Sequence, residues 1–166
     1  MSIDQRGFVM AADSLATWFL DTTMRVLARN DDTGGAFTFI HWEAPTGFGP
    51  PRHVHPTEDE AFYLVTGTLD VVCGDDKWTA GPGDFVFLPK GIPHAFVVTN
   101  GPVEGLQITS PAGFEDYVAE LGRPATSSGL PEPTPPDHEH LMEASERFGY
   151  LIVGPPMCAD DDTTPG

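Results

Sequence analysis

Two histidines and a glutamate lie close together between Gly47 and Gly67. His53 and His55 are two residues apart and follow two prolines, which disfavour a helix. On extended chain their imidazoles point to the same side. Glu60 follows a polar turn, from which the chain can fold back beside the histidines. This spacing predicts a chelate for a divalent metal.

A third histidine, His94, begins a strand-like run after a Gly/Pro-rich turn and can face the same interior. Three imidazoles and one carboxylate form a mixed nitrogen and oxygen shell, which suits Fe, Mn, Co, Ni, Cu or Zn. Four protein ligands on a six-coordinate ion leave two positions for substrate, water or O2, as a catalytic site requires. We therefore expect one divalent transition metal per chain (Ni, Mn, Co or Fe, with Zn as a further candidate), held by His53, His55, Glu60 and His94.

Two further carboxylates, Glu58 and Asp59, directly precede Glu60. The spacing favours Glu60 as the ligand. We expect the other two side chains to face solvent.

The elements that must position these residues are short and separated by turns. The chain has 166 residues, of which 18 are Gly and 17 are Pro. Several short strand-like runs separated by Gly- and Pro-containing turns are typical of an all-β sandwich or small barrel. The predicted strands are 16–20, 23–28, 36–43, 60–66, 69–73, 84–88, 94–99, 106–109 and 150–153.

The pattern changes after residue 110. A helix is predicted over 113–121, ended by Gly122 and Pro124. Residues 123–136 carry five prolines and are predicted to form a linker or surface strap. Asp137 can cap a second helix that runs to Phe148.

The two ligand-bearing segments resemble the two motifs of the cupin family. The pattern Gly-x5-His-x-His-x4-Glu-x6-Gly runs from Gly47 to Gly67, and Gly-x5-Pro-x-Gly-x2-His runs from Gly83 to His94. The second motif usually ends in Asn, where this chain has Val98. In the family, this Asn forms a turn and is not a metal ligand. Its replacement by Val98 therefore leaves the predicted set of metal ligands unaffected. The resemblance implies an all-β fold, a single cupin barrel (a double-stranded β-helix or jelly roll) with the C-terminal helices packed outside.

On this interpretation the chain has four parts. Residues 1–33 are N-terminal strands that join the barrel, and 34–110 are the cupin barrel core. Residues 111–157 hold the C-terminal helices and the Pro-rich strap, and 158–166 form a flexible acidic tail. The resemblance also implies pairing of two barrels through an edge sheet, so we expect a homodimer.

Segments outside the two motifs resemble the single-domain quercetinases of actinobacteria, which are flavonol 2,4-dioxygenases. These segments are 18–20, 32–35, 47–51, 111–114 and 154–156. The resemblance implies a metal-dependent dioxygenase that cleaves a flavonol, or a similar enolisable aromatic substrate, with O2. It also implies that Glu60 is the catalytic base, which takes the proton of the flavonol 3-hydroxyl group before CO and a depside are released.

Strand parity selects the side chains expected to line the pocket. Phe62 and Leu64 share the parity of Glu60, and Phe96 shares the parity of His94. Phe39 and His41 come from the neighbouring strand 36–43. An aromatic lining suits a flat, apolar ligand. The alternative to a role in ligand binding is that these side chains simply fill the barrel core. For His41, the alternative is that it is an ordinary core histidine. The candidates are Phe39, His41, Phe62, Leu64 and Phe96.

The charge balance excludes several classes of partner. Lys and Arg number 8 against 25 Asp and Glu, a net charge of −17. Such a surface repels phosphate backbones and anionic lipids, so we expect neither nucleic acid nor membrane as a partner. The sequence shows no signal peptide and no apolar run of about 18 residues. With Cys73 and Cys158 expected as free thiols, these features predict a cytoplasmic protein.

Two other functions are compatible with the same site. The metal could act as a Lewis acid in a redox-neutral isomerase, cyclase or lyase of secondary metabolism. Alternatively, the protein could bind a small molecule without turnover. Oxygen consumption separates the dioxygenase from both alternatives, and product formation without O2 separates the two alternatives from each other.

Overall fold

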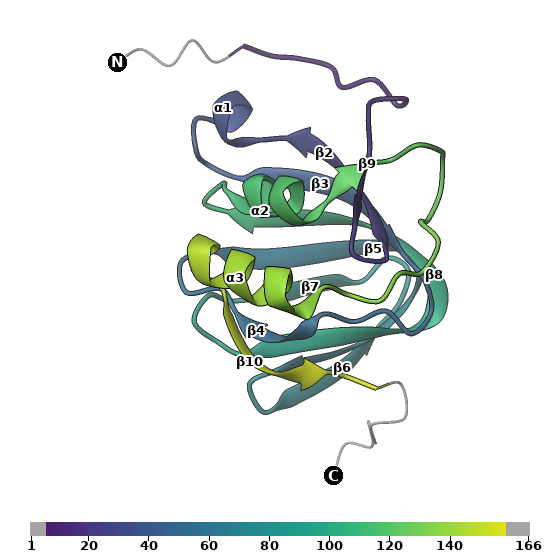
Figure 1. The fold of residues 1–166 in the computed structure, drawn as a ribbon, viewed down its shortest axis with the longest axis vertical. Coiled ribbons are helices and arrows are strands. Elements are labelled where there is room, and N and C mark those ends of the chain that lie inside the picture. Colours follow the sequence, from purple (N-terminus) through teal and green to yellow (C-terminus); the bar gives the residue numbers. More distant parts are fainter. Residues whose placement is uncertain (1–5, 159–166) are drawn as a thin grey trace.

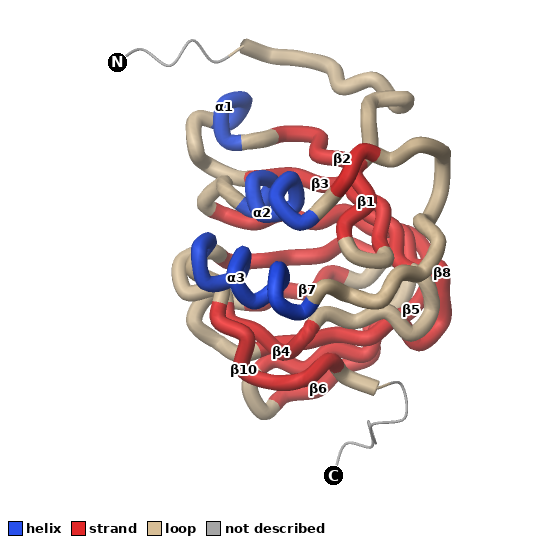
Figure 2. Tube along the Cα trace, in the orientation of Figure 1, coloured by secondary structure: helices blue, strands red, loops and turns tan. Residues whose placement is uncertain are grey.

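The computed structural model describes residues 6–158, so nearly all of the predicted acidic tail lies outside the described residues. Figures 1 and 2 show a mostly β protein with its helices on one side. The strands are β1 (Thr17–Phe19), β2 (Thr22–Ala28), β3 (Thr38–Ala44), β4 (Pro51–Val54), β5 (Asp59–Cys73), β6 (Asp76–Ala80), β7 (Phe85–Leu88), β8 (His94–Ser110), β9 (Arg123–Pro124) and β10 (Leu151–Pro156). The helices are α1 (Asn30–Thr33), α2 (Phe114–Leu121) and α3 (His138–Phe148).

Two long strands, β5 and β8, hold the barrel together. They pair antiparallel from Asp59 opposite Ser110 to Cys73 opposite His94. One half of this pair continues through β7 on one edge and through β3, β2, β1 and β9 on the other. The other half continues through β6 on one edge and through β4 and β10 on the other. We call these the first and second half-sheets. Their inner faces share one hydrophobic core, and the predicted all-β cupin barrel is confirmed.

The sequence divides β5 and β8 into four shorter strands because glycines interrupt both. In the structure the pairing shifts register between Leu64 and Leu69 instead of ending, and the strands continue into the second half-sheet. Gly67 has a φ of 79°, and a Cβ atom there would lie 2.6 Å from the Val103 side chain and 2.8 Å from the Asn100 carbonyl oxygen. Only glycine fits this close approach of the two strands.

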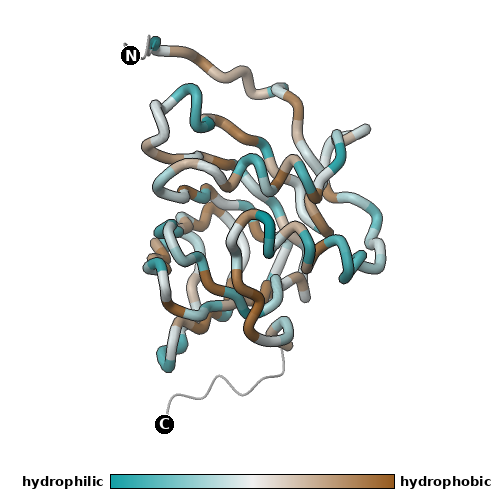
Figure 3. The backbone as a smooth tube through the Cα atoms, turned by 60° about the vertical axis from the view of Figure 1, so that its left-hand side comes forward, coloured by the Kyte–Doolittle hydropathy of each residue, from teal (hydrophilic) through white to brown (hydrophobic). Residues whose placement is uncertain are grey.

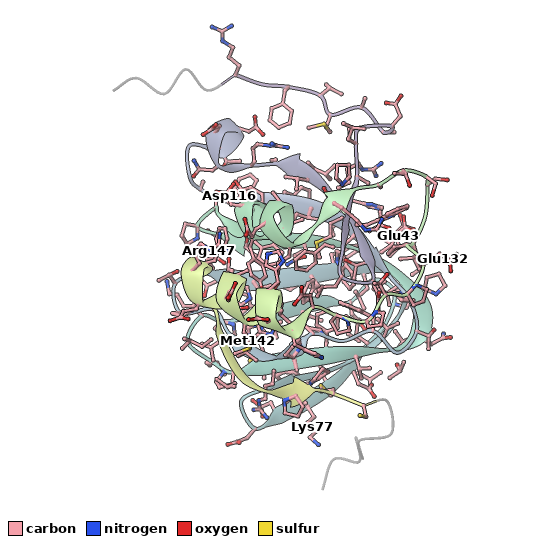
Figure 4. All side chains as sticks on the ribbon, viewed as in Figure 1. Glu43, Lys77, Asp116, Glu132, Met142 and Arg147 are labelled. Carbon is pink, nitrogen blue, oxygen red and sulfur yellow. The ribbon has the colours of Figure 1, made fainter. Side chains whose placement is uncertain are left out.

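The C-terminal helices pack beside each other against the barrel, as Figure 1 shows. Asp137 caps α3 by accepting a hydrogen bond from the His140 backbone N–H at 3.0 Å, as predicted, and Gly149 ends the helix in the left-handed conformation. Met142 and Arg147, labelled in Figure 4, lie on the exposed side of α3. The buried side of α2 and α3 contributes Phe114, Tyr117, Val118, Leu141 and Ala144 to the core.

The segment between α2 and α3 lies along β1 and β2. The Gly129 carbonyl oxygen accepts hydrogen bonds from Trp18 Nε1 at 3.1 Å and from Thr23 Oγ1 at 2.7 Å. Figure 3 shows hydrophobic and hydrophilic stretches alternating along the chain, with hydrophilic stretches at many of the turns. None of the helices in the described range is long and apolar enough to cross a membrane.

Candidate metal centre

Four side chains converge where β4, β5 and β8 approach one another. His53 in β4 pairs directly with His94, the first residue of β8. His55 follows the end of β4, and Glu60 is the second residue of β5. One ligand atom from each of the four lies within 4.8 Å of all the others. The structure therefore brings the four predicted ligands together at the junction of the two half-sheets.

The three imidazoles are oriented in the same way. The Nδ1 atom of His53 lies 2.7 Å from the Pro51 carbonyl oxygen, and that of His94 lies 3.0 Å from the Ile92 carbonyl oxygen. Because a carbonyl oxygen can only accept, each Nδ1 is the donor, and a neutral ring then has its lone pair on Nε2. His55 follows the same rule, with its Nδ1 atom 3.1 Å from a carboxylate oxygen of Glu58.

The Nε2 atoms face one another and Glu60. The His53 and His55 Nε2 atoms are 3.1 Å apart, and Glu60 Oε2 lies 3.9 Å from His55 Nε2 and 3.2 Å from His94 Nε2. His94 Nε2 is buried and makes no hydrogen bond to any described residue. Nitrogen lone pairs and a carboxylate directed at one point fit a divalent transition metal, which would also satisfy the buried His94 nitrogen.

Burial and mutual charge set the protonation of this cluster. Burial lowers the pKa of His53 to about 4, so this ring is neutral at pH 7. Burial also lowers the pKa of His55, but Glu60 and Glu58 raise it by more, and the result lies above the usual value. Burial raises the pKa of Glu60, but the charges on His55 and His94 outweigh it, and the pKa falls to about 2. A proton on His55 Nε2 would point toward His53 Nε2. A metal bound to both nitrogens would take the place of this proton.

Gln107 holds the remaining oxygen of Glu60. Its Nε2 atom donates to Glu60 Oε1 at 2.6 Å, and both side chains are buried. Gln107 lies on β8, which pairs with β5 so that Gln107 is opposite Phe62. This bond directs Oε2 toward the histidines.

The expectation that Glu58 faces solvent is wrong. Its side chain is buried and bonds to His55 and to the hydroxyl group of Tyr150. Glu58 shares the parity of Glu60, and in extended chain that places both carboxylates on the inner side. This parity is the signal in the sequence that could have identified it. Asp59, with the opposite parity, is only half-buried and accepts a hydrogen bond from the Lys90 backbone N–H.

A pocket opens above His53, His55 and Glu60. Its volume is about 70 Å³, and its mouth is open to solvent. The rings of Trp42, Phe62 and Phe96 pack together in its wall, with centroids 5.4 to 5.8 Å apart. The remaining lining residues come from the N-terminal strands, the loop before β4, the start of β4, β8 and the C-terminal region: Phe19, Leu20, Met24, Phe48, Pro50, Pro51, Gln107, Phe114, Tyr117, Leu141, Ser145, Tyr150 and Ile152.

Comparisons with known proteins agree with this geometry. The model of the family described as "Cupin domain" matches residues 40–109, which contain all four clustered ligands. Residues 40–109, the core of the barrel, are therefore a cupin domain.

The curated relatives of this cupin are distant. It is 24% identical over 136 residues to quercetin 2,3-dioxygenase of Bacillus subtilis (strain 168), a match that covers 81% of this chain and 40% of that protein. It is 27% identical over 117 residues to quercetin 2,3-dioxygenase of Aspergillus japonicus, a match that covers 66% of this chain and 33% of that protein. The cupin thus spans less than half the length of the curated relatives it matches.

Solved structures share the fold. KdgF from a Halomonas species superposes with a TM-score of 0.60 at 17% identity, covering 67% of this chain and 99% of that one. A predicted oxalate decarboxylase from Thermotoga maritima gives a TM-score of 0.57 at 18% identity, covering 63% and 99%. At this identity the likeness concerns the barrel alone.

The structure separates the predicted pocket residues of this cupin into two groups. Phe62 and Phe96 lie in the pocket wall. Phe39 and His41 do not, because the inner face of β3 carries Trp42 and the other buried residues, and His41 on the outer face bonds to Glu104 at 2.8 Å. Leu64 also lies away from the described part of the pocket wall, because its side chain is fully buried in the core.

Several wall residues of this cupin were not selected from the sequence. Trp42 lies on the face of β3 opposite His41, and both faces of this strand carry apolar residues in the sequence. Gln107 has the parity of the buried residues of β8. In the sequence it alternates with Leu106 and Ile108, so hydrophobic alternation by itself predicts that Gln107 faces outward. Tyr117 and Tyr150 lie outside the two motifs, and we find no sequence signal that assigns them to the site.

Proposed function

We propose that this cupin is a metal-dependent dioxygenase that cleaves a flavonol, or a similar enolisable aromatic substrate, with O2. The observation that carries this proposal is a buried cluster of three histidines and one glutamate at the floor of an aromatic-walled pocket. The curated relatives named quercetin 2,3-dioxygenase support it.

The metal would be held by His53, His55, Glu60 and His94, one ion per chain. Ni, Mn, Co, Fe and Zn all accept this set of nitrogen and oxygen ligands. When bound, such an ion supplies Lewis-acid chemistry, which lowers the pKa of a coordinated hydroxyl group, and open positions for ligands.

The protein's own residues would orient the substrate and take its proton. The rings of Trp42, Phe62 and Phe96 would stack against a flat aromatic body and exclude water from it. Glu60 Oε2, the oxygen not engaged by Gln107, would accept the proton of the substrate hydroxyl group.

The pocket wall also favours an uncharged substrate. Among the described residues that line it, none is a lysine or an arginine. A carboxylate or phosphate on the body of the substrate would therefore be buried without a countercharge, which is strongly unfavourable.

Oxygen uptake by the purified protein tests the proposal. Metal-free protein is reconstituted in turn with each divalent metal, and quercetin is supplied. We expect O2 uptake matched by loss of the flavonol absorbance with at least one metal, and neither with Glu60→Gln. No uptake by protein shown to hold one metal per chain would overturn the flavonol assignment, and turnover under anaerobic conditions would indicate the redox-neutral alternative.

We also propose that the cupin forms a homodimer through the outer face of the first half-sheet. Tyr63 and Phe85 are directly paired there and are 46% and 66% exposed, and Phe87 on the same strand as Phe85 is 53% exposed. Exposed aromatic side chains gathered on one sheet face are typical of a protein interface.

A further inference from the structure

Tyr150 lies in the C-terminal region, outside the residues matched by the cupin family, yet its hydroxyl group is linked through Glu58 to His55 of the metal cluster. It donates to Glu58, with oxygen–oxygen distances of 2.9 and 3.2 Å to the two carboxylate oxygens. Glu58 in turn accepts from His55 Nδ1 at 3.1 Å. All three side chains are buried, so this chain of hydrogen bonds is shielded from water.

The fold directs Tyr150 toward His55. The left-handed conformation of Gly149 ends α3, and the Tyr150 backbone N–H bonds back to the Ser145 carbonyl oxygen at 2.8 Å. The tyrosine ring then packs on the His55 imidazole, with centroids 4.6 Å apart. The following strand, β10, pairs with β4, which carries His53.

His55 differs from the other two histidines in the group that accepts the hydrogen bond from its Nδ1 atom. His53 and His94 bond to carbonyl oxygens two residues earlier in their own segments, Pro51 and Ile92. His55 bonds to a side-chain carboxylate, and the position of that carboxylate depends on a hydroxyl group 92 residues away in the sequence.

We propose that Tyr150 and Glu58 are positioning residues for the metal ligand His55, and that α3 and β10 thereby belong to the metal centre. A carboxylate on Nδ1 fixes the tautomer with its lone pair on Nε2 and makes that nitrogen a better donor to a metal. The Tyr150 hydroxyl group satisfies the buried carboxylate and holds it beside the imidazole. This inference rests on the proposed metal site and not on the proposed reaction.

The Tyr150→Phe variant removes only the hydroxyl group. Its matched control is Tyr117→Phe, because the Tyr117 ring lies 4.8 Å from that of Tyr150 in the same wall and its hydroxyl group bonds to Ser145 instead. The probe is Co²⁺ added to the metal-free full-length protein, with affinity measured by competition against a chelator and geometry followed by the visible absorption of the bound ion.

We expect Tyr150→Phe to weaken Co²⁺ binding by about 10-fold or more and to change the visible spectrum, as is typical when a group behind a metal-bound histidine is removed. We expect Tyr117→Phe to match the wild type in both. In the Glu58→Gln background, Tyr150→Phe should have a much smaller effect, because the hydroxyl group acts through that carboxylate. Glu58→Gln also tests the chain directly if Tyr150→Phe does not fold.

Two results would overturn the inference, and they are distinguishable. If the wild type binds Co²⁺ in the cluster and both tyrosine variants bind it equally well with the same spectrum, Tyr150 only fills the pocket wall. If the wild type and a His94→Ala variant bind Co²⁺ equally poorly, the proposed metal site is itself absent, and the proposed function falls with it.

Discussion

Gly105 is where the aromatic wall can be perturbed without touching a proposed metal ligand. It lies on β8, opposite Trp42 of β3 and Leu64 of β5. A Cβ atom at Gly105 would be 3.0 Å from the Tyr63 carbonyl oxygen, and 3.1 and 3.4 Å from Nε1 and Cε2 of Trp42. The carbonyl belongs to a paired strand, so in Gly105→Ala the indole must move by a few tenths of an ångström.

This displacement has a definite energetic cost. Trp42 is 1% exposed and packs against Phe62 and Phe96, so the indole has no free space to enter except the pocket. Overpacking of this kind costs about 1–3 kcal/mol of the free energy of unfolding. For a domain of this size we expect the melting temperature to fall by about 2–12 °C. The four proposed metal ligands lie elsewhere, so Co²⁺ affinity should not change.

Thermal and urea unfolding of Gly105→Ala, with Gly81→Ala as the control, provide the assay. A Cβ atom at Gly81 would meet only the flexible Asp84 side chain at 4.0 Å, so this control should change stability by no more than about 0.5 kcal/mol. Adding Trp42→Phe to Gly105→Ala should cost less than the sum of the two single changes. If Gly105→Ala is as stable as Gly81→Ala, the close packing of Trp42 against β8 is refuted.

Three further predictions follow from the same structure. Glu60→Gln should keep the fold, as measured by circular dichroism. It should weaken Co²⁺ binding by at least about 10- to 100-fold, the loss typical when a residue that hydrogen-bonds to a metal ligand is removed. An unchanged Co²⁺ affinity would exclude Glu60 as a ligand. Burial raises the pKa of Glu115, but hydrogen bonds from Thr38 and from backbone N–H groups outweigh it, so the folded-state pKa is lowered. The ionised carboxylate therefore stabilises the fold above pH 4.5 and loses this effect as the pH falls through the folded-state pKa. Glu115→Gln should lower the free energy of unfolding by about 1–3 kcal/mol at pH 7, measured by urea unfolding. The difference in stability between variant and wild type should shrink below pH 4.5, and a difference that does not depend on pH would contradict this reasoning. Phe85→Lys should convert a dimeric protein to monomers in light scattering after size exclusion, whereas an unchanged mass would place the interface elsewhere.

Features that depend on nearby residues could be predicted from the sequence. The spacing of His53 and His55 on extended chain gives their side chains a common direction, because strand parity has a period of two. The limits of α3 followed from Asp137 and Gly149, since capping is decided within one turn of the helix. The four ligands could be proposed as a set because each lies beside a turn that its own segment specifies.

Features that depend on pairing between distant strands were decided only by the tertiary structure. Both faces of β3 are apolar in sequence, and the face that enters the core depends on its register with β8, which places Trp42 over Gly105. The joining of short predicted strands into β5 and β8 likewise depends on their pairing through the register shifts near Gly67. The bond from Tyr150 to Glu58 requires α3 and β10 to fold back across the barrel. Sequence by itself determined which residues form the candidate metal cluster, because their types and their positions beside turns are local properties. Tertiary structure decided which residues surround them, because that depends on contacts between segments far apart in the chain.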